Sequence, residues 1–362
     1  MKALMTALLL LAGTARAWDT VKFLPPVHNK SLEQPVAVAV GSGKIYAVDK
    51  KKDLVLVFDG TGVLEAAVGK TGSGKTEFRD PSGVALGPDG RVFVADKGNS
   101  RIQILDASGK FLWSFGRGGS APGTLSDPEG VAVGSDGRVF VADTGNNRVQ
   151  VFTGEGVFLF GFGSKGKEPG QFSGPTKIAV DPSDGIYVLD SGNGRIQRFD
   201  AAARFLRETP SSADDMAVDA FGYLYVLDSG SGKVTEFDPS GSEQGRLGSS
   251  GKGDFQFRKP QGLALGPDHL MVVADTDNRR LQKMSVPNSR KTAVLPANPA
   301  AKLTVSGPAG AWKFKASGLS VAGDEIFGYL PDAGSFVRLD AGGSELSRFG
   351  SKSGKGPSVT KE

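Results

Sequence analysis

Short apolar runs alternate with turn-forming residues along most of the chain. Between residues 84 and 115, the apolar runs are separated by Pro88-Asp89-Gly90, Lys97-Gly98-Asn99 and Ala107-Ser108-Gly109. Short apolar stretches bounded by Gly, Pro, Asp and Asn are typical of β-strands joined by tight turns. The pattern predicts four short antiparallel strands in each segment of about 40 to 50 residues.

The same strand pattern recurs as a repeated sequence. The clearest copies are RVFVADKGNSRIQILD from Arg91, RVFVADTGNNRVQVFT from Arg138, GIYVLDSGNGRIQRFD from Gly185 and YLYVLDSGSGKVTEFD from Tyr223. Weaker copies begin at Lys44, Leu270 and Glu325, and the sixth residues of the seven copies are spaced by 47, 47, 47, 38, 47 and 55 residues. Because a lone four-stranded sheet of this kind leaves both faces apolar, such sheets pack side by side around an axis. The repeat predicts an all-β fold, a β-propeller of four-stranded antiparallel blades, with seven blades favoured and six as the alternative.

A glycine-rich segment precedes several copies. Before the second copy it reads GKTGSGKT (Gly69 to Thr76), which matches the phosphate-loop pattern of nucleotide-binding proteins. A phosphate loop leads into an α-helix, whereas this segment leads into turn residues and a strand-like run. Equivalent slots hold GRGGSAPG, GSKGKEPG and GSSGKGDF, so the segment is interpreted as part of the repeat and not as a nucleotide site. The connection FLRETPSSADDMAVD, between the fourth and fifth copies, lacks this segment.

Two consecutive motifs in the chain resemble those of the NHL-repeat family of β-propellers. They are F-x-x-P-x-G-V-A-V and V-A-D-x-G-N-x-R-[IV]-Q-[VI]-F, and the resemblance covers roughly Leu32 to Gly350. Members of this family commonly have six blades, and the seventh copy has Leu330 where the others have aspartate. The resemblance implies a rigid platform for interactions with other molecules.

The two ends of the chain differ from the repeats. MKALMTALLLLAGTARA, residues 1 to 17, has a basic start, an apolar run and an A-x-A ending, which predicts a cleaved secretory signal and a secreted or periplasmic protein. Residues 18 to 350 are expected to form one propeller domain, and residues 351 to 362 a flexible polar tail. No later segment is long and apolar enough for a membrane helix. We expect a soluble monomer.

The amino-acid composition limits the kinds of chemistry that the protein can perform. The 52 glycines and 20 prolines favour tight turns over long helices, and the absence of cysteine excludes disulfides and thiol chemistry. Removing Lys2 and Arg16 with the signal lowers the formal charge from +4 to +2, which gives no support to nucleic-acid binding. The only histidines, His28 and His269, are not spaced as metal ligands. No catalytic residue is predicted.

One aspartate recurs at the end of the second predicted strand. It is followed by a turn and then by a basic residue, so its carboxylate is expected to accept backbone N–H bonds and to pair with that base. The residues assigned this structural role are Asp96, Asp143, Asp190, Asp228 and Asp275.

Function is expected where the copies differ, at the entry of each inner strand, because that position faces the mouth of the central channel. Ser82, Glu129, Lys177, Asp215 and Gln261 are the predicted ligand-binding residues, and Lys177 and Asp215 stand where other copies have glycine. A polar set that differs from blade to blade suits a ligand pocket and also a solvated rim. The predicted function is an exported, non-catalytic binding or scaffold module for protein, peptide or glycan.

A calcium-dependent lactonase or hydrolase is the alternative. It would use only oxygen ligands, and no cofactor is predicted otherwise. The acidic candidates for such a site are Glu129, Asp181, Asp214, Asp215 and Asp219.

Overall fold

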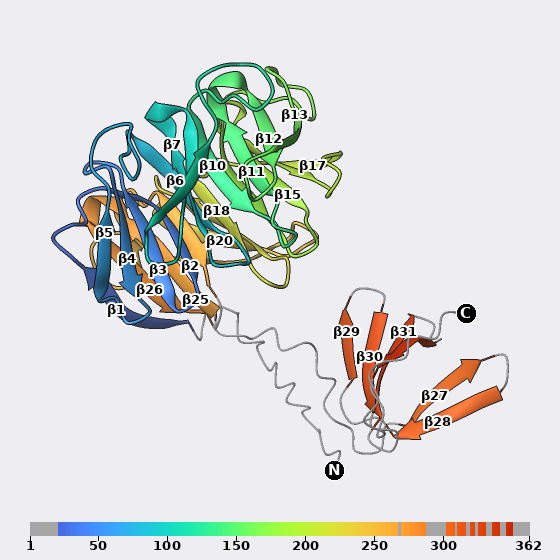
Figure 1. The fold of residues 1–362 in the computed structure, drawn as a ribbon. Helices are drawn as coiled ribbons and strands as arrows, with labels where there is room; N and C mark the ends of the chain where they lie inside the picture. The colour runs from blue at the N-terminus through green and yellow to red at the C-terminus, as the bar shows by residue number, and fades with distance from the viewer. Residues whose placement is uncertain are drawn as a thin grey trace, which may run out of the picture. The chain divides into compact units, whose positions relative to one another are not determined.

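The computed structural model describes residues 21–266, 269–286 and the strands between 302 and 349. The chain divides into two compact units, Met1–Pro287 and Asn288–Glu362. In the described part of the first unit, six four-stranded antiparallel sheets follow one another around a ring (Figure 1). The predicted signal and the tail lie outside the described residues.

The blades are numbered in the order of their innermost strands. Blade 1 contains β2 (Pro35–Gly41), β3 (Lys44–Asp49), β4 (Leu54–Asp59) and β5 (Leu64–Val68). Blade 2 contains β6 (Pro81–Leu86), β7 (Val92–Asp96), β8 (Arg101–Leu105) and β9 (Phe111–Phe115). Blade 3 contains β10 (Pro128–Val133), β11 (Val139–Asp143), β12 (Arg148–Phe152) and β13 (Phe158–Phe162). Blade 4 contains β14 (Pro175–Val180), β15 (Ile186–Asp190), β16 (Arg195–Phe199) and β17 (Phe205–Pro210).

Blade 5 follows the same scheme, whereas blade 6 takes its outermost strand from elsewhere in the chain. Blade 5 contains β18 (Asp215–Val218), β19 (Leu224–Asp228), β20 (Lys233–Phe237) and β21 (Glu243–Leu247). Blade 6 contains β24 (Gly262–Leu265), β25 (Leu270–Asp275), β26 (Arg280–Ser285) and, as its outermost strand, β1 (Lys22–His28) from the other end of the unit. Short 3-10 turns follow the second strands, at η2 (Lys97–Asn99), η3 (Thr144–Asn146), η4 (Ser191–Asn193) and η6 (Thr276–Asn278). The strands β22 (Ser249–Ser250) and β23 (Gln256–Phe257) form a two-residue parallel pair before blade 6.

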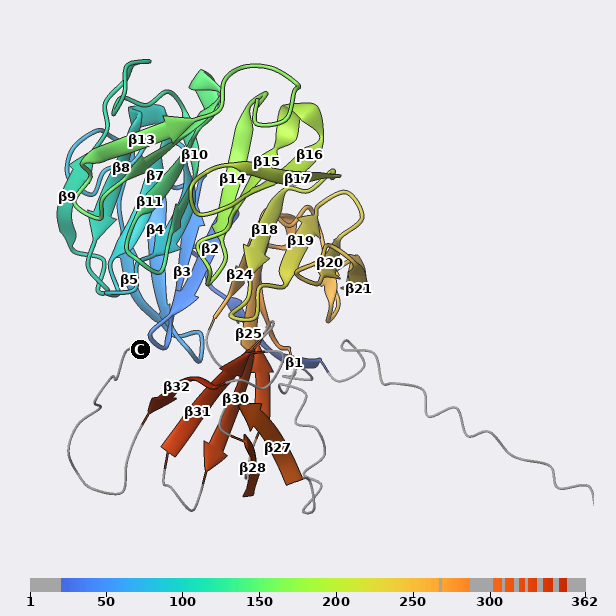
Figure 2. The same ribbon diagram turned by 90° about the vertical axis from the view of Figure 1, so that its right-hand side faces the viewer.

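The innermost strands make the ring. Each packs against the innermost strands of both neighbouring blades, in the cycle β2, β6, β10, β14, β18, β24 and back to β2. Figure 2 shows β14, β18 and β24 next to one another in this cycle. The N-terminal strand completes blade 6 by pairing Val27 with Leu281 and His28 with Arg280. The ring is therefore closed by a segment that the sequence analysis placed outside the repeat.

The ring has six blades, so the preference for seven is not confirmed and the alternative of six holds. The seventh copy belongs to the second unit, where it supplies β30 (Glu325–Leu330) and β31 (Ser335–Asp340). These strands form a sheet with β29 (Leu319–Ala322) and β32 (Glu345–Phe349), beside a hairpin of β27 (Lys302–Gly307) and β28 (Gly310–Lys315) in the same unit. The copy has a blade-like sheet, but the ring closes without it because β1 fills the last position of blade 6.

The position of a strand in its blade explains its burial. The second strands β7, β11 and β15 are buried at every residue because a neighbouring blade covers each face. The outermost strand β13 alternates between half-buried and exposed residues, as expected for a sheet edge with one covered face. No described residue lies in an α-helix, and Gly69 to Thr76 leads through a loop into β6, as predicted. Among the described residues, no helix has the length and apolar character that a membrane crossing requires.

At five of the six blade interfaces, the segment that leads into an innermost strand adds one buried apolar side chain to the cluster between the two blades. We call these side chains the plug residues: Leu32, Phe78, Leu125, Phe172 and Phe257. All are buried, at most 2% exposed, and each precedes by three residues a proline at or next to the start of an innermost strand. Four of them follow a glycine-rich segment, and we call the connections 69–80, 116–127, 163–174 and 248–259, which contain both, the plug loops.

Candidate functional site

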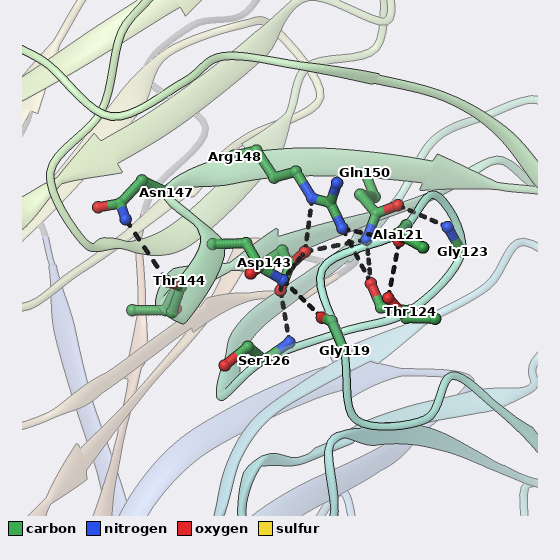
Figure 3. A network of polar contacts seen from close by, with 12 residues as sticks. Gly119, Ala121, Gly123, Thr124, Ser126, Asp143, Thr144, Asn147, Arg148 and Gln150 are labelled. Carbon is green, nitrogen blue, oxygen red and sulfur yellow. Dashed lines mark hydrogen bonds and ion pairs between the residues drawn. The ribbon is translucent and has the colours of Figure 1, made fainter.

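The repeated aspartates hold the plug loops in place. In blade 3 the Asp143 carboxylate accepts hydrogen bonds from the Ser126 backbone N–H at 2.7 Å, Arg148 Nε at 2.7 Å and Gln150 Nε2 at 2.9 Å (Figure 3). Arg148 and Gln150 also donate to the Thr124 carbonyl in the loop. Because Asp143 is fully buried, these donors replace the water that would otherwise solvate its charge. We call the set Asp143, Asn146, Arg148 and Gln150 the clamp.

The clamp recurs in three other blades. Asp96, Asp190 and Asp275 are also fully buried, and each pairs with the arginine five residues later at 2.7 or 2.8 Å. Blade 5 differs, because Asp228 accepts from the Ser231 backbone N–H and the Ser212 hydroxyl instead. The sequence analysis expected the basic partner, which the four clamp aspartates have. It also expected backbone N–H donors from the turn, but in these four blades the backbone donor belongs to the preceding loop, and only Asp228 accepts a turn N–H.

The predicted channel-mouth residues occupy two adjacent positions at the starts of the innermost strands, because Ser82, Glu129 and Gln261 stand one residue before the position of Lys177 and Asp215. At the strand position where Lys177 and Asp215 stand, the other four blades have Ala37, Gly83, Gly130 and Gly262. Small residues fit there because a Cβ on Gly130 would lie 2.6 Å from the Thr176 carbonyl oxygen and 2.9 Å from the Lys177 Cα. Blades 4 and 5 therefore place charged side chains where their neighbours have room for almost none.

Lys177 extends across the channel mouth. Its Nζ lies 3.4 Å from the carbonyl oxygen of Ser82, although blade 3 separates the two blades. The Ser82 hydroxyl donates to the Glu129 carbonyl at 3.0 Å, and the Glu129 carboxylate pairs with Lys97 at 2.5 Å. Lys97 was not predicted, although it stands where the other clear copies have threonine or serine. Gln261 donates its backbone N–H to Ala274.

Asp215 is buried beneath this mouth, with 8% of its surface exposed. Its carboxylate accepts the backbone N–H of Met216 at 2.9 Å and that of Leu263, in blade 6, at 2.8 Å. Burial raises the pKa of Asp215 above its usual value of 3.8, while nearby Lys177 and the two N–H groups act in the opposite direction. The carboxylate thus joins blade 5 to blade 6 and leaves little of its surface for a ligand.

Asp215→Asn should change how stability depends on pH. Because the pKa of Asp215 is raised in the folded state, the unfolded chain ionises first, and the wild-type protein loses stability from this group as pH rises above 3.8. Each unit by which the pKa is raised corresponds to about 1.4 kcal/mol, so the stability of the variant should increase relative to that of wild type as the pH rises above 3.8. Urea unfolding of both proteins at several pH values measures this. A stability difference that is constant with pH would contradict it.

The acidic calcium candidates are not gathered in one place. Asp219 caps the turn after β18 by accepting the N–H groups of Phe221 and Tyr223, at the opposite end of the strand from Asp215. Asp181 caps the equivalent turn of blade 4, and the Asp214 carboxylate accepts the N–H of Ser229. Among the described residues, no three acidic or histidine side chains are grouped as metal ligands.

Sequence comparison identifies the repeat. The NHL repeat matches residues 78–105, 125–152 and 172–199, each of which runs from a plug residue to the end of a third strand. No curated protein sequence matches the chain.

The fold is similar to those of solved propeller enzymes. A streptogramin B lyase is 14% identical, with a TM-score of 0.53 over 75% of this chain and 100% of the lyase. A catalytically inactive histidine-to-alanine variant of virginiamycin B lyase from Staphylococcus aureus, with quinupristin, is 14% identical, with a TM-score of 0.55 over 74% of this chain and 100% of the other. A gluconolactonase from Xanthomonas campestris is 15% identical, with a TM-score of 0.54 over 74% of this chain and 98% of the other. At these identities the likeness concerns the fold alone.

Proposed function

Since the chain is an NHL-repeat β-propeller, we propose that it is an exported, monomeric binding module that engages a protein, peptide or glycan at its channel mouth without catalysis. One observation carries the proposal. The recurring charged residues of the clamps are used in internal bonds, whereas Lys177 departs from the repeat. Among the described residues, no carboxylate lies within ion-pair distance of its ammonium group. A ligand with an anionic group fits this arrangement.

The proposal is tested with an array of peptides and glycans probed with residues 18–362. For any ligand found, Lys177→Ala should weaken binding by roughly tenfold or more, as expected for the loss of a charge-assisted hydrogen bond. Lys167→Ala is the matched control, because Lys167 is exposed on a plug loop. Equal affinities for wild type and both variants would remove the channel mouth from consideration.

The enzymatic alternative finds less support in the side chains. His28 is exposed on β1, the outermost strand of blade 6, and His269 stacks on Phe221 at 6.5 Å before β25. Neither lies on an innermost strand, where residues of all blades converge. The acidic residues that a calcium-dependent lactonase would need are used separately in turns and in backbone contacts.

Metal removal distinguishes the proposed binding module from a calcium-dependent enzyme. For a binding module we expect the melting temperature to stay the same, within error, after treatment with EDTA or after addition of calcium. A calcium-dependent enzyme would be stabilised by its bound ion, so EDTA would lower the melting temperature and abolish turnover. Differential scanning calorimetry of the calcium-loaded and EDTA-treated protein makes this comparison. A fall that calcium reverses would favour the lactonase or hydrolase.

A further inference from the structure

The interface between blades 4 and 5 has no plug residue. β17 ends at Pro210 and β18 begins at Asp215, so only residues 211–214 connect the two blades. The apolar cluster at this interface is formed by strand residues, with Ala213 at its edge. Here the short connection between the fourth and fifth copies leaves out the whole plug loop.

A cleft of about 370 Å³ lies at this interface. We call it the blade 4–5 cleft, and its lining includes Arg198, Arg207, Ala213, Val226, Lys233 and Phe237. Its volume falls within the range of about 300–1,000 Å³ that is common for ligand pockets. Apolar strand residues from both blades line it together with a larger number of polar and charged residues, which include the carboxylates of Asp228, Asp238 and Glu243.

The cleft is lined by the positions that form the clamp elsewhere. Asp228, Ser231, Lys233 and Thr235 align with Asp143, Asn146, Arg148 and Gln150 of blade 3, and all four line the cleft. In blade 3 these positions hold the backbone of residues 119–126, which belongs to the plug loop. In blade 5, serine, lysine and threonine replace the asparagine, arginine and glutamine of the clamp. They face a space that no described segment of the first unit occupies.

The cleft is lined by four cationic side chains as well as by its carboxylates. Two of its cations have partners, because Arg198 pairs with Asp181 and Arg246 with Glu243. Arg207 donates hydrogen bonds to the carbonyls of Pro239 and Ser240, whereas Lys233 lines the cleft with no carboxylate at ion-pair distance among the residues that the structure describes. The buried Nε of Arg198 also has no hydrogen-bond partner there. These groups favour a ligand that brings an acidic side chain and backbone carbonyls.

We propose that the blade 4–5 cleft binds an extended peptide segment of a partner protein, with a Phe or Leu side chain next to an acidic residue. The protein itself shows how such a segment binds. Before blade 2, the segment Glu77-Phe78 buries its phenylalanine between two blades, and its backbone carbonyl accepts bonds from Arg101 and Gln103. A partner segment fills the vacant position with its apolar side chain and backbone carbonyl in the same way. Its acidic residue has a different partner from that of Glu77, which pairs with Lys70 of its own loop, and lies near Lys233. This site is separate from the channel mouth.

The test uses a fluorescein-labelled peptide GKTGSGKTEFRDP, which copies Gly69 to Pro81, and measures fluorescence anisotropy with the full chain. The peptide should bind, and versions with Ala for Phe78 or Lys for Glu77 should bind about tenfold more weakly or worse, because they lose the buried ring or the charge. Thr235→Trp in the protein, which places an indole in the cleft, should abolish binding. Thr61→Trp, in an exposed turn of blade 1, is the matched control.

A variant that binds the peptide more tightly is a second test, because misfolding cannot produce a gain of affinity. The triple variant Ser231→Asn, Lys233→Arg, Thr235→Gln restores the clamp and should bind the peptide at least about tenfold more tightly than wild type, because it restores the side-chain donors that hold the plug loops in the other blades. If neither wild type nor the triple variant binds while both unfold cooperatively, the proposal is overturned.

Two further results would also overturn it. A loss of peptide binding in Lys177→Ala equal to that in Thr235→Trp would assign the peptide to the channel mouth. A concentration-dependent dimer in sedimentation experiments that Thr235→Trp abolishes would show that a second copy of the chain occupies the cleft. Retention of peptide binding in Lys177→Ala, with loss in Thr235→Trp, supports the cleft whether or not the channel mouth binds a ligand of its own.

Discussion

Phe172→Ala should lower the free energy of unfolding by about 3–5 kcal/mol, the usual cost of removing a buried phenylalanine side chain. Phe172 is fully buried between blades 3 and 4, with its ring centroid 5.8 Å from that of Phe199 and 6.2 Å from that of Phe162. The clamp of blade 4 holds its loop at both ends, so the loop cannot easily close the resulting cavity. Guanidinium unfolding at constant pH measures the change.

Phe221→Ala is the control for this substitution. Phe221 is 45% exposed in a turn of blade 5, so its loss should change stability by no more than about 0.5 kcal/mol. Similar effects of the two substitutions would show that the plug residues contribute little to the packing of the blades. They would also weaken the inference that a vacant plug position is a binding site.

Val27→Lys should destabilise the protein by about 3–5 kcal/mol, because it places an uncompensated charge in the interior. Val27 is 3% exposed on β1 and packs in the apolar cluster between blades 6 and 1. A cation already lies close by, because Val27 and the Nζ of Lys283 both lie beside Gly62, and burial lowers the pKa of Lys283, whose Nζ donates to the carbonyls of Gly60 and Thr61. The unfolding midpoint in guanidinium should fall accordingly.

His28→Lys is the matched control for ring closure. It adds the same charge one residue further along β1, where alternation turns the side chain to the exposed face. If both lysine variants unfold at the wild-type midpoint, β1 does not close the ring in solution, and blade 6 must be completed in another way.

The channel mouth shows how far differences between repeats can be interpreted. Lys177 and Asp215 were chosen because they replace a glycine, and the structure places them at equivalent positions of neighbouring innermost strands. Their roles nevertheless differ, because Lys177 reaches across the mouth and Asp215 is used in backbone bonds to blade 6. Substitution in a repeat marks a position of interest, whereas the side chain's partners decide whether it is available to a ligand.

The clamps show a second limit of what can be predicted from sequence patterns. The sequence predicts that Asp143 bonds to its own turn and to Arg148, since those contacts are local. The bonds from Arg148 to the Ala121 and Thr124 carbonyls join residues more than twenty positions apart, and local spacing carries no information about them. For this reason the aspartates were interpreted as turn residues, when they also anchor the loops that pack between blades.

By itself, the sequence determined the strands, their order within a blade and the propeller architecture, because each of these depends on short-range patterns that recur along the chain. It also displayed the short connection before blade 5. Only the tertiary structure decided the number of blades, the role of β1 and the presence of the blade 4–5 cleft. These depend on which distant segments meet when the ring closes, and a seventh copy in the sequence cannot enter a ring that β1 has already completed.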